Sequence, residues 1–340
     1  MHRILLGFVS LFLAIAVPQS AQSDTNSDSN PGARESDISD MDVSVSDTNN
    51  SAEAALEKVM RDDDAAMDEI DAWIRENNAY AAHGAGESKE QLNQKIHTRL
   101  QEVRQGYLDF LKQYPTNAPA YLAFGSFLND IGDEEGASVQ YEKSRQLDPK
   151  DPAAWNDLAN YYGENGPITN AFAYYAKAVE LNPREPVYYE NWATTVYLYR
   201  KDAKEFYGIN EAQVFDKALA LYQKAVALDP NNFLLMTDYA ESYYGIKPLR
   251  ADDALMAWTN ALKIATNDFE RQGVYIHLAR IKMLAGRFSE AQAQLNIITN
   301  SQYEALKDRL QRALIQHEKE AETNRLQSPP ASAPQKSSSL

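Results

Sequence analysis

The chain has 340 residues, a formal net charge of -16 and no cysteine. The charge argues against a nucleic-acid partner, because phosphate binding needs clustered lysine and arginine side chains. The acidity gives only a weak preference for neutral or basic ligands. The absence of cysteine excludes disulfides, thiolate chemistry and a lipid-anchored cysteine, so we expect packing alone to hold the fold together.

Residues 1–23 have the pattern of a secretory signal peptide. Arg3 precedes an apolar run that Pro18 interrupts, and small residues follow up to Ser23. The run is shorter than the roughly 20 apolar residues that a transmembrane helix needs. We therefore expect cleavage near Ala21 to Ser23, no integral membrane span after cleavage, and export to the periplasm or the extracellular space.

Residues 24–51 consist mainly of Asp, Ser, Asn and Thr. So few apolar residues cannot offset the entropy lost on ordering, and we expect a disordered linker. Residues 52–113 then show apolar residues at helical spacing around a loop with two glycines, which predicts a helical hairpin. The inward face of its first helix, about residues 52–78, should consist of Leu56, Met60, Met67, Ile70 and Ile74.

Three adjacent carboxylates, Asp62, Asp63 and Asp64, lie in this first helix. Neighbouring residues of a helix point about 100° apart, so the three cannot jointly enclose a cation as a loop could. We expect a solvated helix face here and no metal site.

Residues 118–151 and 152–185 carry the same 34-residue pattern twice. Each copy predicts a helical hairpin that ends at a proline, and a tyrosine of the second helix should fill the space between successive hairpins. Small side chains allow the two helices of a hairpin to approach closely. The first small position is occupied by Gly125, Ala159, Ala193, Ala240 and Ala279, and the second by Ala137, Ala171, Ala218, Ala254 and Ala291.

The third repeat, residues 186–232, is lengthened by an insertion at residues 200–213. Asn210, followed by Gln213 three residues later, predicts a helix cap. The second helix of this repeat should therefore start near Glu211.

The insertion carries three large apolar residues, Phe206, Tyr207 and Ile209. Insertions in repeat proteins often lie on the binding face, so these residues are candidates for a partner contact. Alternatively, they pack onto the neighbouring hairpin, as isolated apolar residues usually do. The sequence leaves both interpretations open and favours packing.

Two less regular repeats follow at residues 233–268 and 272–301. A final helix over residues 302–320 would place Leu306, Leu310, Ala313 and Leu314 inward and cap the last hairpin. The hairpin at residues 52–113 would cap the other end as a degenerate repeat. Residues 323–340 are rich in Ser and Pro and are expected to be disordered.

This repeat pattern resembles the tetratricopeptide repeat over about residues 88–320, and the chain is similar to exported bacterial proteins of that superfamily without an assigned activity. The resemblance implies an all-α superhelical solenoid with capping helices and disordered termini. It also implies that an inner groove, built from the first helices, binds a peptide or a folded partner. By position, the groove residues are Asn129, Asn156, Asp157, Asn160, Asn191, Thr194, Tyr197, Asp238, Glu241 and Tyr244.

One subgroup of this family holds the C-terminal carboxylate of its ligand with lysine, arginine and asparagine side chains on these inner positions. Only one of the corresponding residues here is of a matching type, which disfavours that mode of binding. The corresponding residues are Leu122, Ser126, Asp157, Val187 and Asn191.

Catalytic and cofactor motifs are absent from the sequence. None of His83, His97, His277 and His317 has a second ligand at the three- or four-residue spacing of a metal pair, and no phosphate-binding loop or Gly-x-Ser-x-Gly motif occurs. His277 with Arg280 could form a small polar site, but a structural or solvated histidine is the favoured interpretation. We expect no cofactor, no metal and no enzymatic activity.

The sequence therefore favours a scaffold that mediates protein–protein or peptide binding. One alternative is a self-associating subunit of an envelope assembly, for which a homo-oligomer is expected. Another is a glycan-binding or enzymatic protein that uses the tyrosine-rich inner face, with Tyr197 and Tyr244 as stacking platforms.

Overall fold

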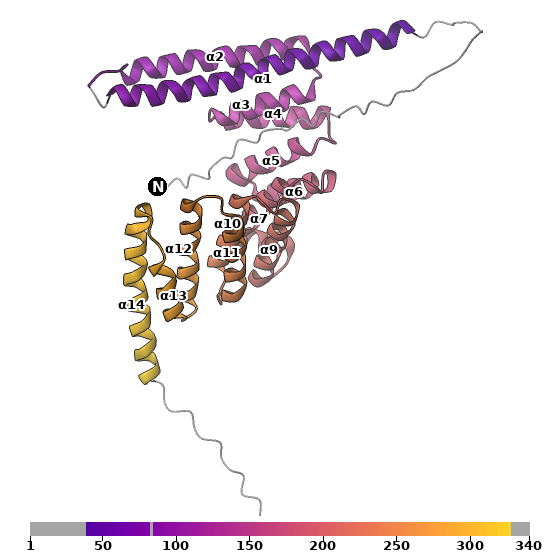
Figure 1. Ribbon diagram of the computed structural model, residues 1–340. Helices are drawn as coiled ribbons and strands as arrows, with labels where there is room; N and C mark the ends of the chain where they lie inside the picture. Colours follow the sequence, from indigo (N-terminus) through magenta and orange to yellow (C-terminus); the bar gives the residue numbers. More distant parts are fainter. Residues whose placement is uncertain (1–38, 82–83, 328–340) are drawn as a thin grey trace, which may run out of the picture. The chain divides into compact units, whose positions relative to one another are not determined.

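The computed structural model describes residues 39–81 and 84–327, with side chains from residue 51 onward. The predicted signal peptide, most of the predicted linker, His83 and most of the C-terminal tail lie outside these residues. Within them the chain is helical and has no β-strand (Figure 1). The chain divides into two units, residues 1–51 and 52–340, and the second unit contains every repeat.

The first helix begins earlier than expected. α1 spans Ser39–Ala81, so residues 39–51 are helical, although we predicted a disordered linker there. No proline or glycine occurs between Gly32 and Gly84. Nothing in the backbone therefore stops the helix from extending toward the N-terminus.

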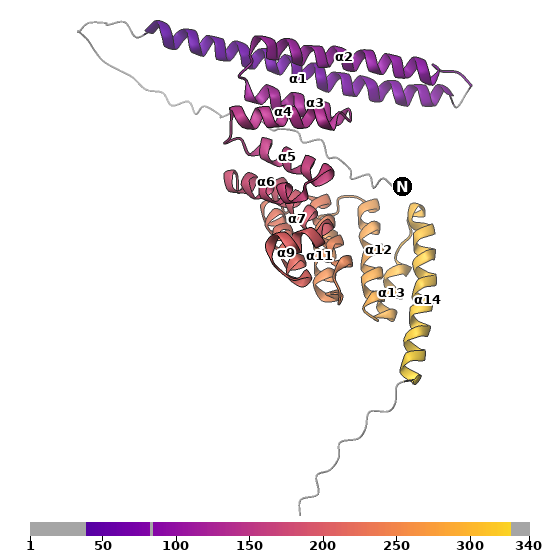
Figure 2. The ribbon, with the colours of Figure 1, turned by 180° about the vertical axis from the view of Figure 1, so that it is seen from behind.

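α2 spans Lys89–Gln113 and runs beside α1 (Figures 1 and 2). Ser88 and Gln91 form a capping box at its start, which satisfies two of the free backbone donors of a helix N-terminus. Tyr107 of α2 is buried against the third helix, with its ring centroid 5.2 Å from that of Phe124. The hairpin thus packs on the first repeat, as a cap would.

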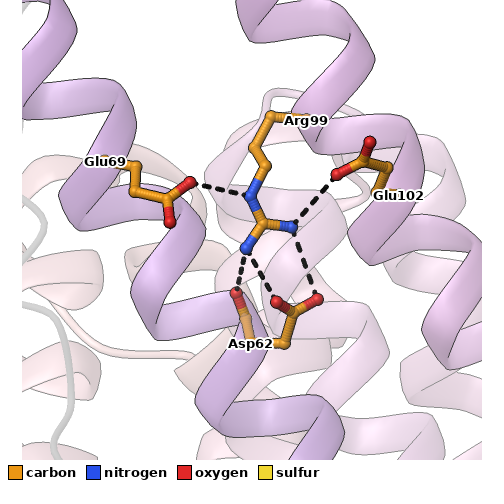
Figure 3. A network of polar contacts seen from close by, with 4 residues as sticks. All are labelled: Asp62, Glu69, Arg99 and Glu102. Atoms are coloured by element: carbon orange, nitrogen blue, oxygen red, sulfur yellow. Dashed lines mark hydrogen bonds and ion pairs between the residues drawn. The ribbon is translucent and has the colours of Figure 1, made fainter.

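The carboxylates of α1 are not a uniformly solvated face, which corrects our prediction. Arg99 of α2 contacts Asp62 at 2.7 Å, Glu69 at 2.9 Å and Glu102 at 3.6 Å (Figure 3). Asp63 accepts a hydrogen bond of 2.8 Å from the Tyr107 hydroxyl. Burial raises the pKa of Asp63 to about 6. Adjacent residues of one helix point in different directions, so Asp62 and Asp63 meet different partners on α2.

Replacing Arg99 with methionine is expected to loosen the α1–α2 hairpin, because three carboxylates would lose their shared counter-ion. We expect amide hydrogens of both helices to exchange about tenfold faster, which corresponds to about 1.4 kcal/mol of local opening free energy. Arg61→Met is the matched control, since Arg61 forms only an exposed pair with Glu57. Similar exchange rates in the two variants would show that the network is not stabilising.

Five further hairpins follow the capping hairpin. Each first helix packs on its own second helix and also on the second helix before it. The hairpins are α3 Ala118–Asp130 with α4 Glu134–Leu147, α5 Pro152–Asn165 with α6 Ile168–Leu181, α7 Pro186–Leu198 with α9 Glu211–Leu228, α10 Phe233–Glu241 with α11 Ala251–Ile264, and α12 Asp268–Leu284 with α13 Phe288–Asn296.

Local sequence explains where these helices begin and how closely they pack. Side chains of Asn117, Asp151 and Asn267 cap the starts of α3, α5 and α12. All ten predicted small positions of the repeats are buried. The all-α repeat fold expected from the sequence is therefore the fold observed.

The insertion forms an additional short helix, α8, spanning Arg200–Tyr207. Phe206 and Tyr207 lie against Phe172 of α6, with ring centroids 5.3 and 5.5 Å away, and the Tyr207 hydroxyl accepts a hydrogen bond from the Trp192 indole. Ile209 packs against the same core. Packing, the favoured interpretation, describes the insertion, and Phe206 alone remains largely exposed at 43%.

The second helix of the third repeat, α9, starts at Glu211, and the expected capping box of Asn210 and Gln213 is present. The last helix, α14, spans Glu304–Gln327 and is longer than predicted. Leu310 and Leu314 of α14 pack against the fifth hairpin. Past Leu314 every described residue of α14 is exposed.

Candidate functional site

The predicted groove residues lie on the first helices, as expected from the repeat positions, and Tyr244 lies on the short 3-10 helix η1, Ser242–Gly245, that follows α10. We call this set of residues the first-helix surface. Most of its members are partly buried, Asp238 and Glu241 are exposed, and Asn156 is buried. The set is Asn129 on α3, Asn156, Asp157 and Asn160 on α5, Asn191, Thr194 and Tyr197 on α7, Asp238 and Glu241 on α10, and Tyr244 on η1.

Asparagine side chains link α5 to α7. Asn191 donates to the Asn156 carbonyl oxygen at 3.1 Å, and Asn156 donates to the Asp157 carboxylate at 3.1 Å. Asn156 is only 4% exposed, which corrects our expectation that it faces a ligand. Its amide is committed to holding two hairpins together, because a buried amide must find its partners inside the protein.

Tyrosines of the second helices reach the first-helix surface in three successive hairpins. The hydroxyl of Tyr175 donates to the Asn160 carbonyl oxygen at 2.7 Å, and the hydroxyls of Tyr222 and Thr194 are 2.8 Å apart. In the first repeat, the Tyr141 hydroxyl interacts with Ser126 at the equivalent position. We call these three pairs the tyrosine series, and in each of them a buried hydroxyl meets the same repeat position of its own first helix.

Three carboxyl groups of α5, α7 and α10 have pKa values well above their ordinary range. Burial raises the pKa of Asp157 to about 7. Burial and the neighbouring Asp238 raise the pKa of Glu190 to about 7, and burial with the charge of Glu241 raises that of Asp238 to about 6. Glu190 and Asp238 are close enough for each to shift the pKa of the other, so the pair titrates as a unit.

Glu190 was not among the predicted residues. It lies 34 residues after Asn156, so it occupies the same repeat position on the next first helix. Applying the repeat spacing to Asn156 would have found it. The carboxyl pair of Glu190 and Asp238 joins the third and fourth repeats on the first-helix surface.

The two tyrosines expected as stacking platforms are both engaged within the protein. The Tyr197 hydroxyl lies against Gly245, and its ring lies 5.9 Å from that of Phe215. The guanidinium of Arg280 lies 4.6 Å from the ring centroid of Tyr244. A face of Tyr244 is therefore already covered by a cation.

The fourth and fifth hairpins meet at His277 of α12. Its ring stacks on Trp258 of α11 with a centroid distance of 4.0 Å. Its Nδ1 atom is 3.0 Å from the Tyr244 hydroxyl, and its Nε2 atom is 4.0 Å from the Glu241 carboxylate. Burial and the charge of Arg280 lower the pKa of His277 to about 4, so the imidazole is neutral at physiological pH. We call Glu241, Tyr244, Trp258, His277 and Arg280 the His277 cluster.

The sequence placed His277 and Arg280 together but did not predict the other members of this cluster. Helical spacing indicates partners on the same helix only, whereas these partners come from α10, η1 and α11. Among the described residues no group of three or more His, Asp or Glu side chains is arranged to hold a metal ion. No helix within the described ranges is both long and apolar enough to cross a membrane.

The fold and this surface define an α-helical repeat protein with paired antiparallel helices. Residues 152–185, the α5–α6 hairpin, match the family model of the tetratricopeptide repeat. Residues 152–185 therefore contain a tetratricopeptide repeat, and the 34-residue pattern of the neighbouring hairpins is similar to it. This fold is typical of protein-interaction scaffolds.

Several solved structures are similar to this chain. YrrB, described as a tetratricopeptide-repeat protein with an unusual peptide-binding site, shares 16% identity over 56% of this chain and 89% of its own, with a TM-score of 0.43. PilF of Pseudomonas aeruginosa shares 13% identity over 76% and 99%, with a TM-score of 0.46. A tetratricopeptide-repeat protein of Thermus thermophilus shares 21% identity over 59% and 98%, with a TM-score of 0.39. No curated protein sequence matches the chain.

Proposed function

We propose that the protein is an exported, non-catalytic scaffold that holds an extended segment of a partner protein on the first-helix surface. Export rests on the signal-like sequence of residues 1–23. Binding of a segment rests on the repeat geometry, because successive first helices present polar groups at a regular spacing. The absence of catalytic motifs from the sequence supports a scaffold role.

The observation that carries the proposal is the state of the carboxyl groups on this surface. Asp157, Glu190 and Asp238 form no ion pair with a lysine or arginine of the described residues. The protein keeps Asp157 and Glu190 partly out of water without supplying a counter-ion, and Asp238 is an exposed carboxyl group beside Glu190. A bound segment with neutral or basic side chains would fit such a surface, whereas an acidic one would be repelled.

Site-specific cross-linking tests this proposal. Benzoylphenylalanine would be placed at Asn160, Thr194 or Asp238, and the cross-linked partner and its residues identified by mass spectrometry in the native organism. We expect all three positions to capture one short segment of a single partner. Synthetic peptide with that sequence should then compete for the cross-link.

Two positions on second helices serve as controls. Val139 of α4 is 62% exposed and Met256 of α11 is 65% exposed, so a photoreactive side chain is accessible at both. Capture of the same segment at these positions, or of unrelated proteins at the three test positions, would refute binding on the first-helix surface.

The acidic groups should contribute to affinity once the segment is known. Replacing Glu190 with glutamine and Asp238 with asparagine removes charge without changing shape, and we expect about tenfold weaker binding of a peptide with a basic side chain. Titration calorimetry measures the change. Unchanged affinity would show that these carboxyl groups do not face the ligand.

The alternative of glycan binding is not favoured by the geometry. Sugar stacking needs a free aromatic face, yet the Tyr244 ring carries Arg280 and the Tyr197 ring packs beside Phe215. Self-association stays a hypothesis that light scattering over a range of concentrations would test. Neither alternative explains the uncompensated carboxyl groups of the first-helix surface.

A further inference from the structure

The tyrosine series stops at the fourth repeat. In the first three repeats, a tyrosine hydroxyl pairs with Ser126, Asn160 or Thr194. Trp258 is the large aromatic residue of α11 in the fourth repeat, and the residue equivalent to Thr194 is Glu241, 47 residues later. An indole has one donor and no acceptor, so it cannot reproduce the properties of the tyrosine hydroxyl.

Trp258 and Glu241, which occupy the two positions of this pair in the fourth repeat, do not bond to each other. Trp258 is 1% exposed, and its indole N–H meets no acceptor among the described residues. The Glu241 carboxylate is exposed, and its shortest described polar contact is the 4.0 Å separation from His277. A buried donor without an acceptor costs free energy, so the fourth repeat gives up stability that the first three retain.

His277 takes the place that a tyrosine hydroxyl has in the other repeats. Because His277 is neutral, one ring nitrogen carries the proton and the other accepts. The Tyr244 hydroxyl donates to Nδ1 at 3.0 Å in the tautomer that leaves the proton on Nε2. This tautomer is favoured because the group 4.0 Å from Nε2, the Glu241 carboxylate, is an acceptor. The Nε2–H group therefore lies near an acceptor that is too distant for a direct hydrogen bond.

The gap between Nε2 and the carboxylate has the size of one bridging atom. Two hydrogen bonds of about 2.8 Å that meet at a single oxygen separate their outer atoms by roughly 4 to 4.6 Å, and the observed separation is 4.0 Å. The bridging atom must accept from Nε2–H and donate to Glu241. A hydroxyl group does both.

Charged groups fit this gap poorly. Arg280 lies beside Tyr244 and lowers the pKa of His277, so its charge would repel a lysine or arginine of a ligand. Glu241 would repel a carboxylate. Within the described residues Arg280 forms no ion pair that would cancel its charge. The cluster therefore discriminates in favour of a neutral hydrogen-bonding group.

We propose that Glu241 and His277 bind the side-chain hydroxyl of a serine or threonine in the segment held on the first-helix surface. This inference rests on the proposed function and assigns one position of that segment. The broken tyrosine series makes the fourth repeat the place where the ligand, and not the protein, completes the hydrogen bond.

Peptide display on phage tests the inference even while the partner is unidentified. A library of random 12-residue peptides would be selected on the full chain without residues 1–23. We expect the selected peptides to be enriched in Ser or Thr at a fixed distance along the peptide from a basic residue. The enrichment should disappear on His277→Phe, which keeps an aromatic ring against Trp258, and should persist on Glu76→Gln, which alters an exposed residue of α1.

Affinities of one selected peptide complete the test. Replacing its Ser with Ala should weaken binding to the unaltered protein about ten- to hundredfold, as expected for a hydrogen bond to a charged group. The same replacement should weaken binding to His277→Phe or Glu241→Gln less than twofold, so that a double-mutant cycle isolates the contact. Circular dichroism confirms that each variant is folded.

Trp258→Tyr provides a second and independent variant. A tyrosine here would extend the tyrosine series to the fourth repeat, and its hydroxyl would compete with the ligand for Glu241. We therefore expect this variant to bind the Ser peptide more weakly and to bind the Ala peptide with unchanged affinity.

The outcomes separate the two proposals. Selected peptides without a Ser or Thr preference would overturn the inference and leave the proposed function intact. A chain that selects no peptide would overturn the proposed function and the inference with it.

Discussion

Replacing Gly125 with alanine should lower the free energy of unfolding by about 2 to 3 kcal/mol. A Cβ atom at this position would lie 2.5 Å from two ring carbons of Tyr141. The ring cannot easily move, since it is only 4% exposed and is packed on all sides. The α3–α4 hairpin would have to open, although alanine ordinarily favours a helix over glycine.

Gly163→Ala is the matched control, because Gly163 lies in α5, the equivalent first helix of the next repeat. A Cβ atom there would have no neighbour closer than 4.0 Å. We expect this variant to be stabilised by about 0.5 to 1 kcal/mol from helix propensity. Urea unfolding followed by circular dichroism measures both changes, and similar effects at the two positions would contradict the steric explanation.

The sequence predicted the repeat fold because its decisive information is periodic. A small residue such as Gly125 and the tyrosine that covers it recur with the repeat, so the pattern specifies which helices approach closely. The start of α1 was not predictable in this way. Residues 39–51 have a composition typical of disorder, and composition says nothing about the backbone continuity that lets a neighbouring helix extend.

The candidate site was predicted only at the level of repeat position. The spacing placed Asn156 on the correct helix, but its burial depends on Asn191 of the next repeat, which reaches it at 3.1 Å. Whether a polar residue is buried depends on the side chains that pack over it. Those side chains come from the next helix, and the angle at which the two helices cross determines which ones they are. The His277 cluster could not be predicted for the same reason, since its members lie on four successive elements and no single sequence spacing joins them all.

The insertion shows the limit of reasoning from hydrophobicity alone. The sequence allowed both a partner contact and a packing role for Phe206, Tyr207 and Ile209, and it favoured packing. The indole of Trp192 decides the question, because it donates to the Tyr207 hydroxyl at 2.9 Å and orients the ring toward the core. Only the fold brings these two side chains together.

Stability should rise as the pH is lowered from about 8.5 to about 6.5. The folded-state pKa values of Asp157 and Glu190 are about 7, and that of Asp238 is about 6, all above the unfolded values of carboxyl groups. The folded state therefore binds more protons than the unfolded state in this window, so protonation favours folding. This contribution is fully present below the unfolded pKa values and is lost as the pH rises through 6 to 7.

His277 acts in the opposite direction at lower pH. Its folded-state pKa of about 4 lies below the ordinary value of 6.5, so the unfolded state binds the proton more readily as the pH falls below 6.5. One imidazole offsets only part of the effect of three carboxyl groups, so stability should rise less steeply with acidification below pH 6.5. We expect the midpoint of thermal unfolding to be about 3 to 6 °C higher at pH 6 than at pH 8.5, after allowance for the solvent that still reaches Glu190 and Asp238.

The combined variant Glu190→Gln and Asp238→Asn identifies the source of this dependence. Neutral amides keep the shape of the pair and carry no charge to desolvate, so the variant should be at least as stable as the unaltered protein at pH 8.5 and should respond less to acidification. Glu76→Gln is the control, because Glu76 is exposed on α1 and its replacement should leave the pH profile unchanged. Calorimetry between pH 5.5 and 8.5 compares the three proteins. Parallel profiles in all three would show that the carboxyl pair is ionised and solvated in the folded state, which would also remove the observation that carries the proposed function.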